Sequence, residues 1–118
     1  MTHLVDSDWI IDAIHGFPDA LAALEENADD GLAISIITVG EVYDGAYDFP
    51  NPEEHLQSFR KFLEWYDVIG LSTETMEFFA KTRSRLRREG NIIADLDLLI
   101  AATAVVNNLT LMTRNLRL

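Results

Sequence analysis

Residues 32–41 read LAISIITVGE and join an apolar run to the start of a helix. The β-branched run over residues 32–37 predicts a buried strand. Thr38 follows this run, and Glu41 stands three positions later, which is the spacing of a capping box at a helix N-terminus. The pattern predicts a strand that passes directly into a helix ending at about Tyr47, which is the unit from which α/β folds are built.

The same alternation of short apolar runs and helical patterns continues on both sides of this stretch. Further strands are predicted at residues 3–6, 67–71 and 110–112. Apolar spacing and proline or glycine breaks predict helices at residues 9–14, 18–30, 73–89 and 95–107. A further helix is predicted after the break at residues 49–52, with Leu56 on its apolar face and its end near Tyr66. We therefore expect one α/β domain over residues 1–118, a three-layer α/β/α sandwich with a short, mostly parallel central sheet.

The charge of the chain is strongly negative and unevenly distributed. The formal net charge is −11 at pH 7. Residues 1–59 hold eight Asp and five Glu but no Lys or Arg, a net charge of −13, whereas residues 60–118 carry +2. This balance argues against a protein that grips nucleic acid over its whole surface. It suggests instead a charged partner or a bound cation.

The 118 residues contain no cysteine, which excludes disulfides, thiolate metal sites and thiol nucleophiles and fits a reducing compartment. Asp6, Asp8 and Asp12 stand where a signal peptide would have a basic start and an apolar run. The longest uncharged apolar stretch, residues 98–106, is about half of a membrane span. We expect a soluble cytoplasmic protein with no membrane segment.

Polar side chains are predicted just after the strand ends or in the first turn of the next helix: Asp6, Glu41, Asp95, Asp97 and Asn115. In a parallel sheet these positions converge at one edge, which is where ligands bind. Three or more carboxylates meeting there would resist ionisation unless a cation were present. Mg²⁺ and Mn²⁺ take oxygen ligands of this kind, and such an ion can orient a water and stabilise charge on a phosphate.

Each carboxylate also has a structural interpretation. Asp6 suits the cap of the first helix, Glu41 is the capping-box partner described above, and Asp95 suits the N-cap of the last helix. Asp97 shares its helical face with apolar residues three, four and seven positions later, so it is expected to point toward the interior. A carboxylate in that position needs a partner, because an isolated buried charge is costly.

The densest basic cluster lies on the long helix predicted at residues 73–89. It consists of Arg83, Arg85, Arg87 and Arg88. Such a cluster is either a solvated helix face or an edge that contacts the phosphates of a nucleic acid.

Four segments, in this order and with these spacings, carry a family resemblance over almost the whole chain. They read LVDSDWII (residues 4–11), ISIITVGEVYDGA (34–46), DLLIAATA (97–104) and LMTRN (111–115). They resemble the sequence motifs of the PIN domains and, among these, of the VapC-type toxin ribonucleases found in bacterial and archaeal toxin–antitoxin pairs.

The resemblance implies the members of the site. The core metal-binding and catalytic carboxylates would be Asp6, Glu41 and Asp97, the last because it directly precedes the Leu-Leu-Ile-Ala run. Supporting positions beside them would be Ser7, Asp95, Thr113 and Asn115. The family usually adds a fourth acidic residue and a final strand after the Thr-x-Asn motif. That place falls at or near Leu118, which would make this chain a truncated or a divergent member.

The resemblance also implies an activity and partners. The activity would be Mg²⁺- or Mn²⁺-dependent hydrolysis of phosphodiester bonds in structured RNA, tRNA or rRNA, with a metal-held water attacking phosphorus and leaving a 5′-phosphate and a 3′-hydroxyl. Such proteins typically form homodimers. They are held inactive by an antitoxin whose C-terminal segment covers the acidic groove and often offers it an arginine.

Three alternatives are weighed against this hypothesis. The DSD run at residues 6–8 suggests a phosphoryl-transfer enzyme of the haloacid dehalogenase type. Such an enzyme would need a lysine downstream, near the phosphate, and no lysine follows Lys81. A Mg²⁺-binding receiver-type signalling domain would need an Asp ending the third strand and a Lys after the last. Instead, Asp67 begins the third predicted strand and Thr113 follows the last. A PIN-like scaffold that binds a partner without cutting RNA stays open.

Overall fold

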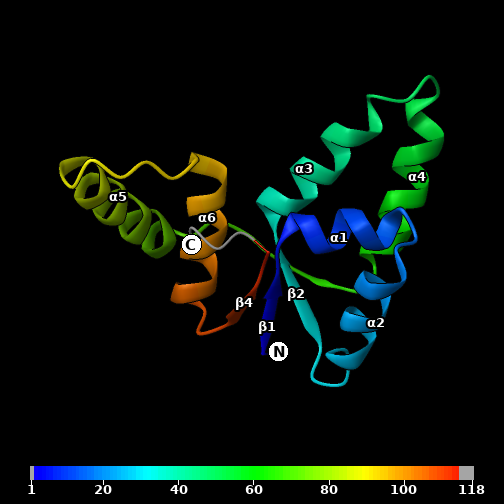
Figure 1. Cartoon of the computed structure of the whole chain (residues 1–118), viewed down its shortest axis with the longest axis horizontal. Coiled ribbons are helices and arrows are strands. Elements are labelled where there is room, and N and C mark those ends of the chain that lie inside the picture. Colours follow the sequence, from blue (N-terminus) through cyan, green and yellow to red (C-terminus); the bar gives the residue numbers. More distant parts are fainter. Residues whose placement is uncertain (1, 115–118) are drawn as a thin grey trace.

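The structure, a computed structural model, describes residues 2–114 and has a parallel sheet at its centre (Figure 1). Within these residues the sheet has four strands in the order β3-β2-β1-β4. Every neighbouring pair is parallel, with Leu4 opposite both Ala33 and Leu111. The strands are β1 (His3–Val5), β2 (Leu32–Ser35), β3 (Asp67–Ile69) and β4 (Thr110–Met112).

Helices cover both faces of this sheet, which confirms the predicted α/β/α sandwich (Figure 1). The helices are α1 (Ser7–Ile14), α2 (Pro18–Glu26), α3 (Ile36–Ala46), α4 (Pro52–Leu63), α5 (Thr73–Arg88) and α6 (Asp95–Val106). The first four lie on one side of the sheet. On the other side α6 lies on the sheet and α5 packs outside it. Within residues 2–114, every helix falls short of the length and hydrophobicity that crossing a membrane requires.

The two layers follow from the alternation of side chains along the strands. Val5 and Ile34 point into the larger core, which contains buried residues from α1 to α4. Leu4 and Ala33 point the other way and pack against Ile100 and other apolar residues of α6. Because β1 and β2 are buried on both faces, they read as continuous apolar runs rather than as alternating ones.

The start of α3 differs from the prediction. The helix begins at Ile36, and its N-cap is Ser35, whose Oγ accepts a hydrogen bond from the Ile37 N–H at 3.1 Å. The predicted strand to Ile37 and the capping box of Thr38 with Glu41 are therefore wrong. The hydroxyl at the last position of β2 caps the helix first, and Thr38 lies buried inside the first turn, where its Oγ1 faces the hydroxyl of Ser7. Glu41 consequently lies in the second turn, free of a capping role.

The other predicted helix ends are confirmed or differ by a few residues. Asp6 is the N-cap of α1 as predicted, with the helix beginning at Ser7, and Ser72 is the N-cap of α5. Asp95 is not an N-cap, because Ala94 holds that position and Asp95 is the first helical residue of α6. The helix predicted at residues 18–30 ends earlier, at Glu26.

Candidate active site

Asp6 lies at the carboxyl end of β1 and is only 5% exposed. Its two carboxylate oxygens have separate partners. Oδ1 accepts a hydrogen bond from the backbone N–H of Ser7 at 2.7 Å, and Oδ2 accepts one from the hydroxyl of Thr113 at 2.5 Å. The Asp6 backbone N–H donates to the carbonyl of Met112 at 2.9 Å. The carboxylate is thus fixed between the start of α1 and the residue that follows β4.

Ser7 connects this carboxylate to α3. Its buried hydroxyl donates to Oε1 of Glu41 at 2.5 Å and lies 3.3 Å from Oγ1 of Thr38. Ser7 is the first residue of α1, whereas Thr38 and Glu41 face it from the first two turns of α3. A buried polar network therefore joins the two helices that leave β1 and β2 at the same edge of the sheet.

Glu41 has a raised pKa. Burial of the carboxyl group away from water is the largest cause, and the hydrogen bond from Ser7 partly opposes it. The negative charges of Asp6, Asp97 and Asp44 raise the pKa further. Glu41 thus lies within electrostatic reach of both Asp6 and Asp97, which come from distant parts of the sequence.

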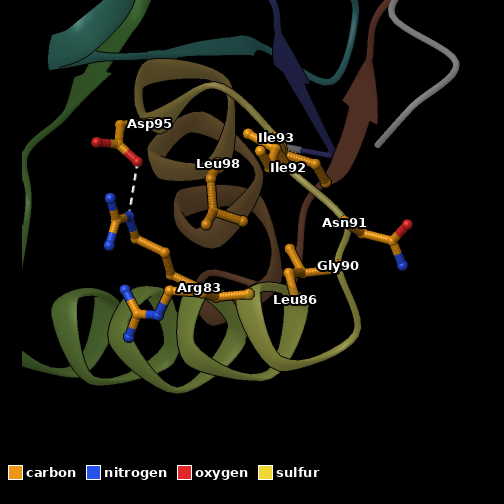
Figure 2. Close-up of a pocket in the computed structure, with 9 residues that line it drawn as sticks. Arg83, Leu86, Gly90, Asn91, Ile92, Ile93, Asp95 and Leu98 are labelled. Carbon is orange, nitrogen blue, oxygen red and sulfur yellow. Dashed lines mark hydrogen bonds and ion pairs between the residues drawn. The ribbon is translucent and has the colours of Figure 1, made fainter.

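Asp97 and Asp95 have different surroundings although they share the first turn of α6. Asp97 is half-buried. Asp95 is exposed, and its Oδ1 lies 2.8 Å from Nε of Arg83 on α5, in an ion pair drawn as a dashed line in Figure 2. Because Asp95 is inside the helix and turned toward α5, it does not join the other carboxylates.

The chemistry of the three carboxylates fits a hard divalent cation. They supply only oxygen atoms, and the raised pKa of Glu41 reflects an excess of negative charge that a cation would relieve. Over residues 2–114, however, no three acidic or histidine side chains are arranged to coordinate a common ion. Both oxygens of Asp6 and one of Glu41 are turned to hydroxyl or backbone donors instead. A carboxylate has about four lone-pair sites on its two oxygens, so these hydrogen bonds leave sites that a cation can use.

The basic cluster on α5 is partly neutralised by ion pairs. Arg83 pairs with Asp95, Arg85 lies 4.0 Å from Glu89, and Arg88 donates to the hydroxyl of Ser84. The groove between α5 and α6 has a volume of about 300 Å³. Figure 2 shows Leu86, Ile92, Ile93 and Leu98 on its walls. The Arg83–Asp95 ion pair lies at one end of this groove, so it brings the basic helix beside the first turn of α6.

Sequence reasoning missed a second set of contacts, centred on Arg114. Its backbone N–H donates to Asp8, and its guanidinium group donates to Asp12 at 2.6 Å and to Asp19 at 2.9 Å. The same group lies 4.0 Å from the centroid of the Trp9 ring. Arg114 stands inside the LMTRN segment, but nothing in its spacing pointed to α1 and α2. Asn115 and the position near Leu118 lie outside the described residues.

Comparison with known proteins identifies the family. Residues 4–118 match the model of the PIN domain. The chain is 30% identical over 121 residues to ribonuclease VapC2 of Rickettsia felis, an alignment that covers 99% of this chain and 89% of that protein. It is 26% identical over 114 residues to the tRNA(fMet)-specific endonuclease VapC of Salmonella typhimurium, covering 97% and 86% of the two chains.

The fold is similar to that of solved toxin–antitoxin structures. It superimposes with a TM-score of 0.89 and 29% identity on a chain in the crystal structure of VapBC2 from Rickettsia felis bound to a DNA fragment from their promoter. The match covers 99% of this chain and 90% of that chain. This protein belongs to the PIN domain family, and its relatives within that family include VapC ribonucleases.

Proposed function

We propose that this protein is a ribonuclease toxin that hydrolyses phosphodiester bonds in structured RNA with the help of Mg²⁺ or Mn²⁺. The observation that carries the proposal is the convergence of Asp6, Glu41 and Asp97 at the carboxyl edge of the sheet, with Glu41 in electrostatic contact with both aspartates. The ribonuclease names of its relatives in Rickettsia felis and Salmonella typhimurium support the same activity.

The residues of the site divide into ligands and supports. Asp6, Glu41 and Asp97 would hold the cation, which when bound activates a water and neutralises charge on the scissile phosphate. Ser7 orients the carboxylate of Glu41, and Thr113 orients that of Asp6, each through a hydroxyl that donates a hydrogen bond of 2.5 Å. Outer partners of this kind fix the direction of metal ligands and tune their affinity.

The arginines of α5 are proposed to contact the RNA backbone. They are the densest group of cations in a chain of net charge −11, and α5 packs beside the helix that carries Asp97. The contact would therefore be local, confined to one helix, and sensitive to salt because each phosphate contact releases counterions. A tRNA or rRNA substrate in the cytoplasm fits this limited contact, since a folded RNA presents its own shape to the protein.

We further propose that an antitoxin neutralises the protein and that the toxin forms a homodimer. The solved structure from Rickettsia felis contains VapB and VapC together. In this chain, the first 59 residues contain no Lys or Arg, so the acidic edge of the sheet suits a partner segment that brings arginine. A bidentate arginine would then occupy the carboxylates that the cation needs.

A non-catalytic scaffold is the second candidate, and one observation favours it. Within residues 2–114 the acidic side chains are not arranged to coordinate one ion as they stand. Such a protein would bind RNA or an antitoxin through the same surface without cutting RNA.

Cleavage by the purified, antitoxin-free protein separates the two candidates. Pooled tRNA and rRNA are incubated with Mn²⁺, with Mg²⁺ or with a chelator, and the ends of the products are mapped. The ribonuclease proposal predicts metal-dependent fragments with 5′-phosphates. Folded protein that binds these RNAs but leaves them intact under either metal would favour the scaffold.

A further inference from the structure

We propose that Arg114 is a positioning residue that clamps the end of β4 onto α1 and α2 and thereby holds the hydroxyl of Thr113 against Asp6. The clamp itself is a feature of the fold. Its consequence for metal binding rests on the proposed function of Asp6.

Arg114 makes four contacts with two helices that lie about one hundred residues earlier in the chain. Its backbone N–H donates to Oδ2 of Asp8 at 2.9 Å, and its two terminal guanidinium nitrogens donate to Asp12 on α1 and Asp19 on α2. The guanidinium plane also lies over the ring of Trp9, where a cation–π attraction adds to the ion pairs. Lysine could not reproduce this arrangement, because it lacks a planar fork of donors.

The end of β4 needs such a clamp. The strand has three residues and lies at the edge of the sheet, where it pairs only with β1 among the described strands. Thr113 follows immediately and must reach Asp6 with its hydroxyl at 2.5 Å. A short edge strand frays easily, because few hydrogen bonds hold it. Arg114, the next residue, therefore attaches the chain to α1 and α2 immediately after Thr113, whose hydroxyl contacts Asp6.

The same contacts distinguish Asp6 from the other aspartates that lie near Arg114. Asp12 and Asp19 are paired with the guanidinium group of Arg114. Asp8 accepts hydrogen bonds from the backbone N–H of Trp9 on one oxygen and from that of Arg114 on the other. Asp12 and Asp19 are thus neutralised by a cation of the chain itself and Asp8 is held by two backbone N–H groups, whereas Asp6 is held by Ser7 and Thr113 at the end of β1.

The test compares Arg114→Gln and Arg114→Lys with Thr113→Val, with the double variant Thr113→Val/Arg114→Gln, and with a matched control. The control is Arg60→Gln, since Arg60 also makes an ion pair, with Glu53, and a cation–π contact, with Tyr43, but on α4. Two quantities are measured on each full-length protein. The first is amide hydrogen exchange of residues 5–8 and 110–114 without metal, and the second is the dissociation constant for Mn²⁺ alone.

The clamp predicts a specific pattern. Arg114→Gln speeds exchange at the amides of Asp6 and Arg114, which donate to Met112 and Asp8, while Arg60→Gln leaves both unchanged. Arg114→Gln and Thr113→Val each weaken Mn²⁺ binding about tenfold, the lower end of the loss seen for supporting residues of metal sites. The Mn²⁺ affinity of Arg114→Lys lies between those of Arg114→Gln and the parent. The double variant binds no more weakly than Thr113→Val, because Arg114 acts through that hydroxyl.

Either of two results would overturn the clamp. The first is that the amide exchange rates of Arg114→Gln equal those of Arg60→Gln. The second is that the double variant loses Mn²⁺ affinity by the product of the two single losses. Failure of the proposed function has a different signature. A parent protein that neither binds Mn²⁺ nor cuts RNA contradicts the metal-dependent ribonuclease, and the exchange data then decide the clamp without reference to metal.

Discussion

Ser7 and Glu41 are joined by a hydrogen bond of 2.5 Å although 34 positions separate them in the sequence. The bond links the first residue of α1 to the second turn of α3, at the edge where β1 and β2 both end. The backbone N–H of the same serine holds Asp6. One small residue thus sets the direction of two of the three carboxylates that we assign to the cation.

Replacement of Ser7 by alanine tests this link. Ser7→Ala leaves the carboxylate of Glu41 without its donor, so RNA cleavage should fall about tenfold or more. The free energy of unfolding should fall by only about 1 kcal/mol, the usual net contribution of one hydrogen bond. Initial cleavage rates and urea denaturation measure the two effects. Ser58→Ala, which removes an exposed hydroxyl on α4, should change neither, and full cleavage activity in Ser7→Ala would refute the orienting role.

The raised pKa of Glu41 makes the stability of the metal-free protein depend on pH. Because burial and the neighbouring carboxylates raise the pKa in the folded state, the folded protein holds this proton more tightly than the unfolded chain does. The parent should therefore lose stability relative to Glu41→Gln as pH rises from 4.5, the ordinary value, through the raised pKa. Above that range the difference in the free energy of unfolding should be constant.

Denaturation curves of the two metal-free proteins at a series of pH values give this difference. Asp44→Asn provides the control, because it removes one of the three negative charges that act on Glu41. In the Asp44→Asn protein the pKa of Glu41 should be raised less, so the pH range over which the stability difference changes should end at a lower pH. A difference that does not change with pH, or that changes with the opposite sign, would contradict the electrostatic account of the site.

The α5 arginines give a prediction for RNA binding. Arg87→Gln/Arg88→Gln removes two exposed charges from α5. KM for RNA should rise severalfold while kcat stays constant. The slope of log affinity against log salt should become shallower by about 0.7–0.9 per lost phosphate contact. Arg60→Gln on α4 controls for the loss of positive charge as such. An unchanged salt slope in the double variant would remove α5 from the RNA-binding surface.

Much of the fold could be predicted because it depends on local patterns. Buried parallel strands are continuous apolar runs, and the run at residues 32–37 gave β2 its place next to the helix that carries Glu41. Since parallel strands end at one edge, the polar residues Asp6 and Glu41, which follow β1 and β2, had to converge. Neither step required knowledge of long-range contacts.

The misplaced details depend on competition between neighbouring groups. Ser35 and Thr38 can each cap a helix, and the hydrogen bond from the Ile37 N–H to Oγ of Ser35 starts the helix at the earlier position. Asp95 suits an N-cap by residue type, but Arg83 on α5 attracts its carboxylate. Arg114 finds its partners on α1 and α2 through the closure of the whole sheet, and no spacing in the sequence encodes that distance.

The cleavage of RNA by variants of the two aspartates is the most direct test of the account. Purified, antitoxin-free parent, Asp6→Asn, Asp97→Asn and Asp67→Asn are compared with Mn²⁺ on the same RNA pool, after circular dichroism shows that all four are folded. Asp67→Asn removes an equal charge at the start of β3, at the amino ends of the strands and so away from the proposed site. We predict that parent and Asp67→Asn cut equally, whereas Asp6→Asn and Asp97→Asn are slower by at least about 100-fold. Cleavage by Asp6→Asn and Asp97→Asn at the rate of the parent would contradict the assignment of the site.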